Sequence, residues 1–115
     1  MLTYAVIVFA IGALGGLVLA SYVLQDRLAP WALSLLHAAL GAIGLLLVIY
    51  AAITTGISRA AVAALVILAV AALGGFYLAS IHLGNKVAPK PVVVIHAGVA
   101  VIGFLTLLGV VVHVL

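Results

Sequence analysis

The residues best suited to chemistry in this 115-residue chain are its four histidines, because the chain has no cysteine and a single acidic residue, Asp26. Two of the histidines, His37 and His96, lie inside long apolar runs. A titratable side chain in such a run is costly unless it faces other helices and finds a partner there. His37 and His96 are therefore the leading candidates for function.

These two histidines coincide when the sequence is aligned with itself. A shift of 59 positions overlays residues 13–46 on residues 72–105 without a gap, and Ala-Leu-Gly-Gly, Leu-Ala-Ser, Ala-Pro and His-Ala recur in both copies. The pattern predicts a doubled unit, with a first two-helix repeat over residues 1–56 and a second over residues 57–115. His82 and His113 have no histidine counterpart and lie near the ends of apolar runs, where we expect interfacial anchors.

The composition predicts an integral membrane protein. Hydrophobic residues make up 70% of the chain, charged residues 4%, and the mean hydropathy is +1.67. Four apolar runs, over residues 2–24, 31–53, 60–83 and 92–115, are each long enough to cross a bilayer as a helix. We expect an all-α integral membrane four-helix bundle, since helices satisfy every backbone group within hydrocarbon. The first run lacks a basic leader and aligns with the third, so we expect a retained span, not a secretory signal.

Each repeat crosses the membrane twice, so both copies start on the same side and run in the same direction. The repeats are then related by a pseudo-twofold axis along the membrane normal, with His37 and His96 at equal depth. Arg27, Lys86 and Lys90 lie in the first and third loops, against Arg59 on the other side. The positive-inside rule predicts cytoplasmic first and third loops and external termini. The membrane we expect is the inner (plasma) membrane of a bacterium or archaeon.

Small residues surround the predicted histidine pair. Positions i+4 and i+7 share a helix face with residue i. The first and third spans also bring glycines to a similar depth. The residues concerned are Gly41 and Gly44 after His37, Ala100 and Gly103 after His96, and Gly15, Gly16, Gly74 and Gly75 in the other two spans. Walls of this kind either pack closely or hold a flat molecule.

A b-type haem is one molecule that fits this pattern, because its iron takes two axial imidazoles and bundle cores supply such ligands from facing helices. His37 and His96 would be the axial ligands, and Arg27, Lys86 and Lys90 would pair with the propionates. Two other interpretations stay open. The small residues can serve close helix packing while the histidines hydrogen-bond to neighbouring helices, or the histidines can carry a metal ion or protons.

The element Pro-x6-His-Ala opens both the second and fourth spans, at Pro30 and Pro89. In this respect the chain resembles small bacterial four-helix inner-membrane proteins of unassigned function. Its arrangement is also similar to b-type cytochromes of the cytochrome b561 and superoxide oxidase kind and to haem-carrying anchors of succinate dehydrogenase. That resemblance implies bis-histidine haem ligation and electron exchange with quinone or a partner oxidoreductase. A second haem layer would need two more histidines, and the far side offers only His113.

Several function classes are excluded or disfavoured. The net charge of +3 comes from four scattered basic residues, so no nucleic-acid partner is expected. Small multidrug transporters use a membrane-embedded glutamate, whereas Asp26 lies in a loop. No lysine falls within a predicted span, which excludes a retinal Schiff base. The expected surroundings are the lipid bilayer, and glycine-rich outer faces are compatible with a homodimer.

Overall fold

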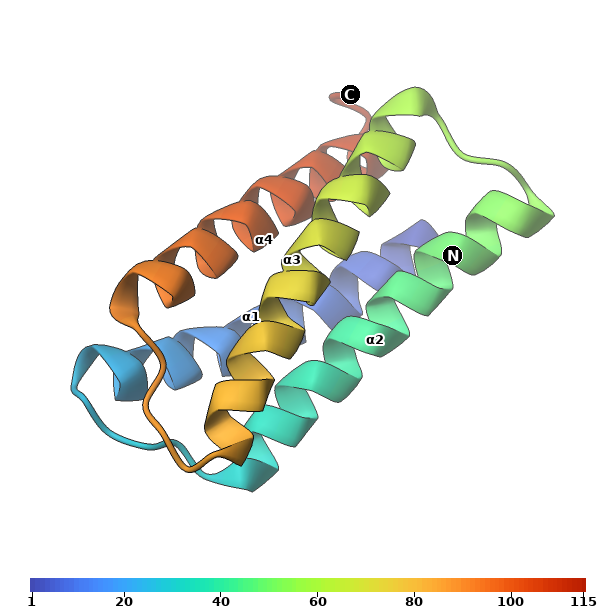
Figure 1. Cartoon of the computed structure of the whole chain (residues 1–115). Coiled ribbons are helices and arrows are strands. Elements are labelled where there is room, and N and C mark those ends of the chain that lie inside the picture. Colours follow the sequence, from blue (N-terminus) through green and yellow to red (C-terminus); the bar gives the residue numbers. More distant parts are fainter.

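The computed structural model describes all residues, 1–115, as four helices without strands (Figure 1). The helices are α1 (Leu2–Leu24), α2 (Trp31–Thr54), α3 (Arg59–Leu83) and α4 (Lys90–Val111). All four are long and apolar enough to span a membrane. The chain is therefore an all-α, multi-pass membrane four-helix bundle, as its composition predicts.

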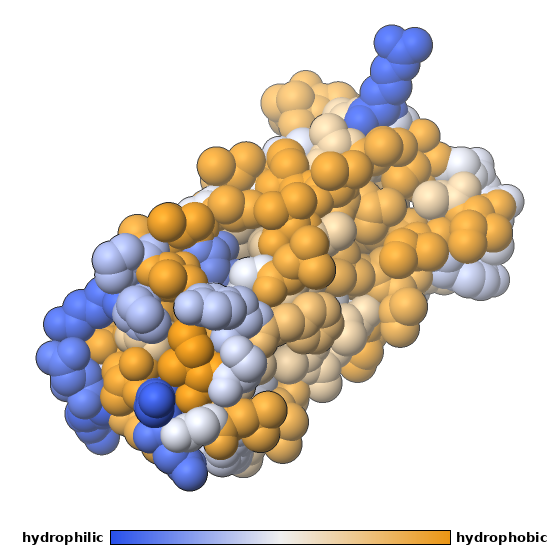
Figure 2. Space-filling model, viewed as in Figure 1, coloured by the Kyte–Doolittle hydropathy of each residue, from blue (hydrophilic) through white to orange (hydrophobic).

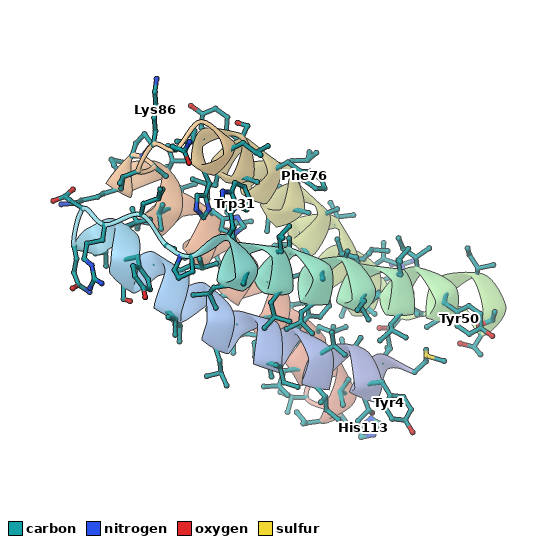
Figure 3. All side chains as sticks on the ribbon, turned by 90° about the horizontal axis from the view of Figure 1, so that it is seen from below. Tyr4, Trp31, Tyr50, Phe76, Lys86 and His113 are labelled. Carbon is teal, nitrogen blue, oxygen red and sulfur yellow. The ribbon has the colours of Figure 1, made fainter.

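The bundle is 42 Å long and has two chemically different ends. Loop 1 (residues 25–30) and loop 3 (residues 84–89) lie side by side at one end, called here the loop end (Figure 1). Loop 2 (residues 55–58) and both termini lie at the other, the terminal end. Hydrophilic residues gather at the loop end, and apolar residues cover the middle (Figure 2). Trp31 and Lys86 mark the loop end and Tyr4, Tyr50 and His113 the terminal end (Figure 3).

Helices α1 and α3 end in the same way. Asp26 and Asn85, which are 59 positions apart, adopt left-handed φ angles of 56° and 55°. In each case the next residue donates its N–H five residues back, Arg27 to Tyr22 and Lys86 to Ile81. This is the Schellman arrangement, in which a short polar side chain tolerates the left-handed residue. The following Ala-Pro then leads into α2 or α4, so the repeat recurs in the backbone as well as in the sequence.

Helix α4 differs in its limits from the apolar run over residues 92–115. It begins at Lys90, because Pro91 at its start needs no intrahelical N–H partner. It ends at Val111, because His113 takes a left-handed φ of 63° and the N–H of Val114 turns back to the carbonyl of Gly109. His113 is thus a helix-ending residue outside the span.

The helices pack as two hairpins. Contacts are most extensive between α1 and α2 and between α3 and α4, fewer between α1 and α4, and fewest between α2 and α3. The diagonal pairs, α1 with α3 and α2 with α4, are not in direct backbone proximity. Helices α2 and α4, which carry the candidate histidines, therefore face each other across the centre of the bundle.

The terminal half of the bundle holds the apolar core and keeps the symmetry of the repeat. Four of the five completely buried side chains form matching pairs 59 positions apart, Ala5 with Ala64 and Val48 with Leu107. The fifth, Ala61, corresponds to the half-buried Leu2. The backbone at Gly44 lies against the Phe9 ring, and that at Gly103 against Leu68. These contacts are related by the same shift. We call this set, with its partly buried neighbours, the terminal core.

Candidate cofactor site at the histidine pair

The structure brings His37 and His96 together inside the bundle. On α2, His37 shares a helix face with the buried residues Gly44, Val48 and Ala51. On α4, His96 shares the corresponding face with other buried residues, Val93, Gly103 and Leu107. The ring centroids are 6.4 Å apart and the ring planes are nearly perpendicular, at 85°. Two imidazoles from diagonal helices thus lie next to each other with their planes nearly perpendicular.

The hydrogen bond of His37 fixes its tautomer. Its Nδ1 lies 2.8 Å from the carbonyl oxygen of Gly12 on α1. A carbonyl can only accept, so Nδ1 carries the hydrogen and donates it. In the neutral ring Nε2 then keeps its lone pair. A histidine that donates Nδ1–H to a backbone carbonyl and presents Nε2 has the arrangement of a metal-ligating histidine with its outer partner in place.

His96 lacks the equivalent bond. Its Nδ1 is buried and has no hydrogen-bond partner. The carbonyl of Ala71, the residue that matches Gly12 in the repeat, faces this ring but does not form a bond of good geometry with it. The Nε2 atoms of both His37 and His96 also have no partner within the chain, and neither is fully enclosed. Three of the four ring nitrogens of the pair, namely Nε2 of His37 and both nitrogens of His96, therefore have no hydrogen-bond partner.

The predicted glycines of α1 and α3 touch the imidazoles themselves. A Cβ at Gly16 would lie 2.8 Å from Cε1 of His37, and one at Gly75 would lie 3.3 Å from Cε1 of His96. At Gly15 and Gly74 the nearest histidine atoms would be 3.9 Å and 3.5 Å away. Each Gly-Gly pair is thus a flat backbone surface against which one imidazole ring lies.

The small residues that follow the histidines fall into two groups. Gly44 and Gly103 lie against Phe9 and Leu68, so the terminal core fills the space beside them. Beside Gly41 a Cβ would meet nothing within 4 Å, and Ala100 is half-buried. Beyond the histidines, space for an added side chain is therefore shown at Gly41, one turn after His37.

The three basic residues predicted to pair with propionates all lie at the loop end, on the same side of the bundle centre as the histidine pair. Lys90 forms an exposed ion pair with Asp26, with Nζ and Oδ2 3.3 Å apart. The Arg27 guanidinium lies 4.9 Å from the Tyr22 ring centroid. Lys86 projects away from the bundle (Figure 3). None of them contacts the histidine pair.

His82 differs most from its expected role. It is the one buried polar side chain, 9% exposed, although an interfacial anchor would reach water. Its ring stacks on Trp31 with centroids 4.1 Å apart and planes 12° apart. Its Nδ1 lies 3.1 Å from the Ser34 hydroxyl and its Nε2 2.9 Å from the Ala29 carbonyl. We call His82, Trp31, Ser34 and the Ala29 carbonyl the His82 cluster.

Other polar features do not add ligands to the pair. No group of three or more histidine, cysteine or acidic side chains converges on a point where a metal ion could be held. Ser21 and Ser80 donate to carbonyls of their own helices. A hollow of about 540 Å³ lies at the terminal end, lined by helix-end residues that include His113, and does not involve His37 or His96.

Comparison with known proteins adds no relative. No family model, curated protein or solved structure matches the chain. The fold and the site together define a four-helix membrane protein with two inward-facing imidazoles at its centre. The function must be argued from that geometry.

Proposed function

We propose that the chain is a small membrane cytochrome that holds one b-type haem between His37 and His96 and exchanges electrons with quinone or a partner oxidoreductase. The observation that carries the proposal is the pairing of two imidazoles from diagonal helices, with ring centroids 6.4 Å apart. An ion about 2 Å from each of two opposed imidazole nitrogens separates the centroids by about 6 Å.

The donor set also fits a haem iron. Axial ligands of b-type haem are neutral imidazoles that bind through one nitrogen while the other donates to an outer partner. His37 meets both requirements through its bond to Gly12. His96 offers an Nε2 without a partner and a buried Nδ1 without a hydrogen bond of good geometry, close to the carbonyl of Ala71. The iron would supply one-electron chemistry, and the chain would supply ligation, an apolar setting and exclusion of water.

The surroundings restrict where a macrocycle could extend. Phe9 and Leu68 occupy the space beside Gly44 and Gly103, on the terminal side of the histidines. The macrocycle would therefore extend towards the loop half, nearer the basic residues Arg27, Lys86 and Lys90. Carboxylate groups at that edge would find cations and interfacial water. On this proposal loops 1 and 3 are cytoplasmic.

A second candidate function is a cofactor-free membrane scaffold. The specific observation in its favour is that the chain's own side chains fill the space beside several glycines. His37 lies against Gly16 and bonds to Gly12, and Phe9 fills the space beside Gly44. In such a protein the contact between the two imidazoles would itself join the two hairpins. The cytochrome would absorb visible light, whereas the scaffold would be colourless.

The test is the visible spectrum of the protein purified in detergent from haem-sufficient cells. The cytochrome predicts a Soret band that shifts on reduction with dithionite, and its loss in both His37→Ala and His96→Ala. The matched control is His113→Ala, which removes a histidine at the terminal end and should leave the band unchanged. A colourless, helical protein that also fails to take up added haemin would reject the cytochrome in favour of the scaffold.

A further inference from the structure

The two junctions between the hairpins are equivalent in the repeat but different in chemistry. At the loop end, the α2–α3 junction contains Trp31, Ser34 and His82, whereas the positions 59 residues away hold Lys90, Val93 and Val23. Every polar or aromatic member of the His82 cluster therefore departs from the repeat. Within the repeat, the dipeptide that lies between these positions is kept, as Ala29-Pro30 and Ala88-Pro89, so the three departures that meet at the α2–α3 junction are changes of individual residues within an aligned repeat.

The hydrogen bonds of His82 leave neither ring nitrogen free. The Ala29 carbonyl accepts, so Nε2 carries the hydrogen, and in the neutral ring Nδ1 accepts from the Ser34 hydroxyl. His82 thus has the opposite tautomer to His37. Stacking on Trp31 fixes the plane of the same ring. Three contacts from one side chain define both the position and the rotation of the start of α2.

The position of α2 matters because Ser34 and His37 are three residues apart and share a helix face. Of the neighbouring helix pairs, α2 and α3 make the fewest contacts, so few other interactions hold α2 in register with α3. A change in the rotation of α2 at Ser34 is transmitted to His37 one turn further on, because the helix between them is continuous.

We infer that His82 is a positioning residue for the histidine pair: by holding Ala29, Trp31 and Ser34 it sets the depth and rotation of His37 opposite His96. The inference extends the proposed function, because it names a residue on which the axial ligand geometry would depend. It concerns the arrangement of the apoprotein as well, so it can be tested whether or not haem is bound.

The experiment is nitrogen NMR of the full-length protein in lipid, without added haem, with only histidine labelled by ¹⁵N. Four histidines give few enough ring signals for assignment by single substitutions. The wild type should show His37 with hydrogen on Nδ1 and His82 with hydrogen on Nε2. His82→Val, which installs the residue type found at Val23, should shift the ring signals of both His37 and His96 beyond their linewidths.

Two further variants separate positioning from general loss of packing. His82→Gln retains one donor and one acceptor, and should return the signals of the pair towards their wild-type values. Ser34→Val, which installs the residue type found at Val93, replaces the hydroxyl that donates to His82 with methyl groups, and should give a smaller shift in the direction seen for His82→Val. The matched control is His113→Thr, which copies Thr54 and should leave the pair unchanged.

The inference is overturned if His82→Val removes its own signals and leaves those of His37 and His96 in place, or if His113→Thr moves them equally. If His82→Val does not fold, Ser34→Val decides alone, and unchanged His37 and His96 signals in that variant overturn the inference. A wild-type protein that takes up no haem but shows the expected shifts would reject the cytochrome and leave the positioning role intact.

Discussion

The terminal half and the loop half of the bundle follow different rules. In the terminal half, four of the five completely buried side chains form pairs related by the repeat, Ala5 with Ala64 and Val48 with Leu107. In the loop half, the buried polar residue is His82, which the repeat matches with Val23. Much of the apolar packing is thus duplicated, whereas the polar contacts of His82 occur at only one of the two junctions between the hairpins. The two halves therefore differ in what holds the helices together: repeat-related apolar packing in the terminal half, and a buried histidine at a single junction in the loop half.

The largest effect is expected from filling the terminal core. A Cβ at Gly44 would lie 2.6 Å from the Phe9 ring, whereas one at Gly41, a turn away, would meet nothing within 4 Å. We expect Gly44→Ala to lower the free energy of unfolding by about 1–3 kcal/mol, since overpacking forces side chains off their rotamers. Gly41→Ala is the matched control and should be neutral or slightly stabilising. Unfolding in detergent followed by circular dichroism measures both, and equal stabilities would contradict this description of the core.

A smaller effect, concentrated on the histidines, is expected at the Gly-Gly surfaces. Gly16→Ala places a methyl group 2.8 Å from His37 Cε1, while Gly15→Ala places one 3.9 Å from His37 Cβ. The first variant should displace the ring, weaken its bond to Gly12 and cost about 1–2 kcal/mol, of which the hydrogen bond accounts for about 1 kcal/mol. The second should cost little. Chemical unfolding and the His37 nitrogen signals report the two effects, and a larger response to Gly15→Ala would disprove the assigned contact.

An effect of about 1 kcal/mol is expected from Ser34→Ala, which leaves Nδ1 of the buried His82 without its donor. Ser21→Ala is the matched control, because the exposed Ser21 hydroxyl donates to Val18 of its own helix. Its loss should change stability by only a few tenths of a kcal/mol. Similar losses of stability in the two variants would argue that His82 does not depend on Ser34.

The smallest effect is expected for the ion pair that joins the loop end of α4 to loop 1. The side chains of Lys90 and Asp26 are 48% and 77% exposed, so solvent screens their attraction. Lys90→Gln should change the free energy of unfolding by less than about 0.5 kcal/mol. Added salt should have little influence on the wild type for the same reason. A loss of stability comparable to that of Ser34→Ala would show that the α1–α4 junction depends on polar contacts as the α2–α3 junction does. That result would contradict the difference between the two junctions.

Much of the architecture follows from sequence alone. Hydropathy predicts the four helices, and the repeat predicts that His37 and His96 meet at equal depth, because a two-helix unit repeats without inversion. The distance between two rings on diagonal helices depends on side-chain rotamers and on how closely the hairpins approach, which periodicity does not specify. The limit of α4 at Val111 was also missed, since the left-handed turn at His113 interrupts a run that stays apolar to its end.

The His82 cluster is the main feature that the sequence analysis did not find. Its members are far apart in sequence and look unremarkable singly, as a histidine near a helix end, an interfacial tryptophan and a helical serine. The available signal was that His82, Trp31 and Ser34 all replace residues of different chemistry in the other repeat.

The most direct test of the central claim is low-temperature EPR of the oxidised, haem-loaded protein. Imidazole planes 85° apart, as in the histidine pair, make two iron d orbitals nearly equal in energy. The account therefore predicts a strongly anisotropic low-spin ferric signal that is lost in both His37→Ala and His96→Ala. A high-spin signal in the wild type, or a low-spin signal that survives either substitution, would contradict ligation by this pair.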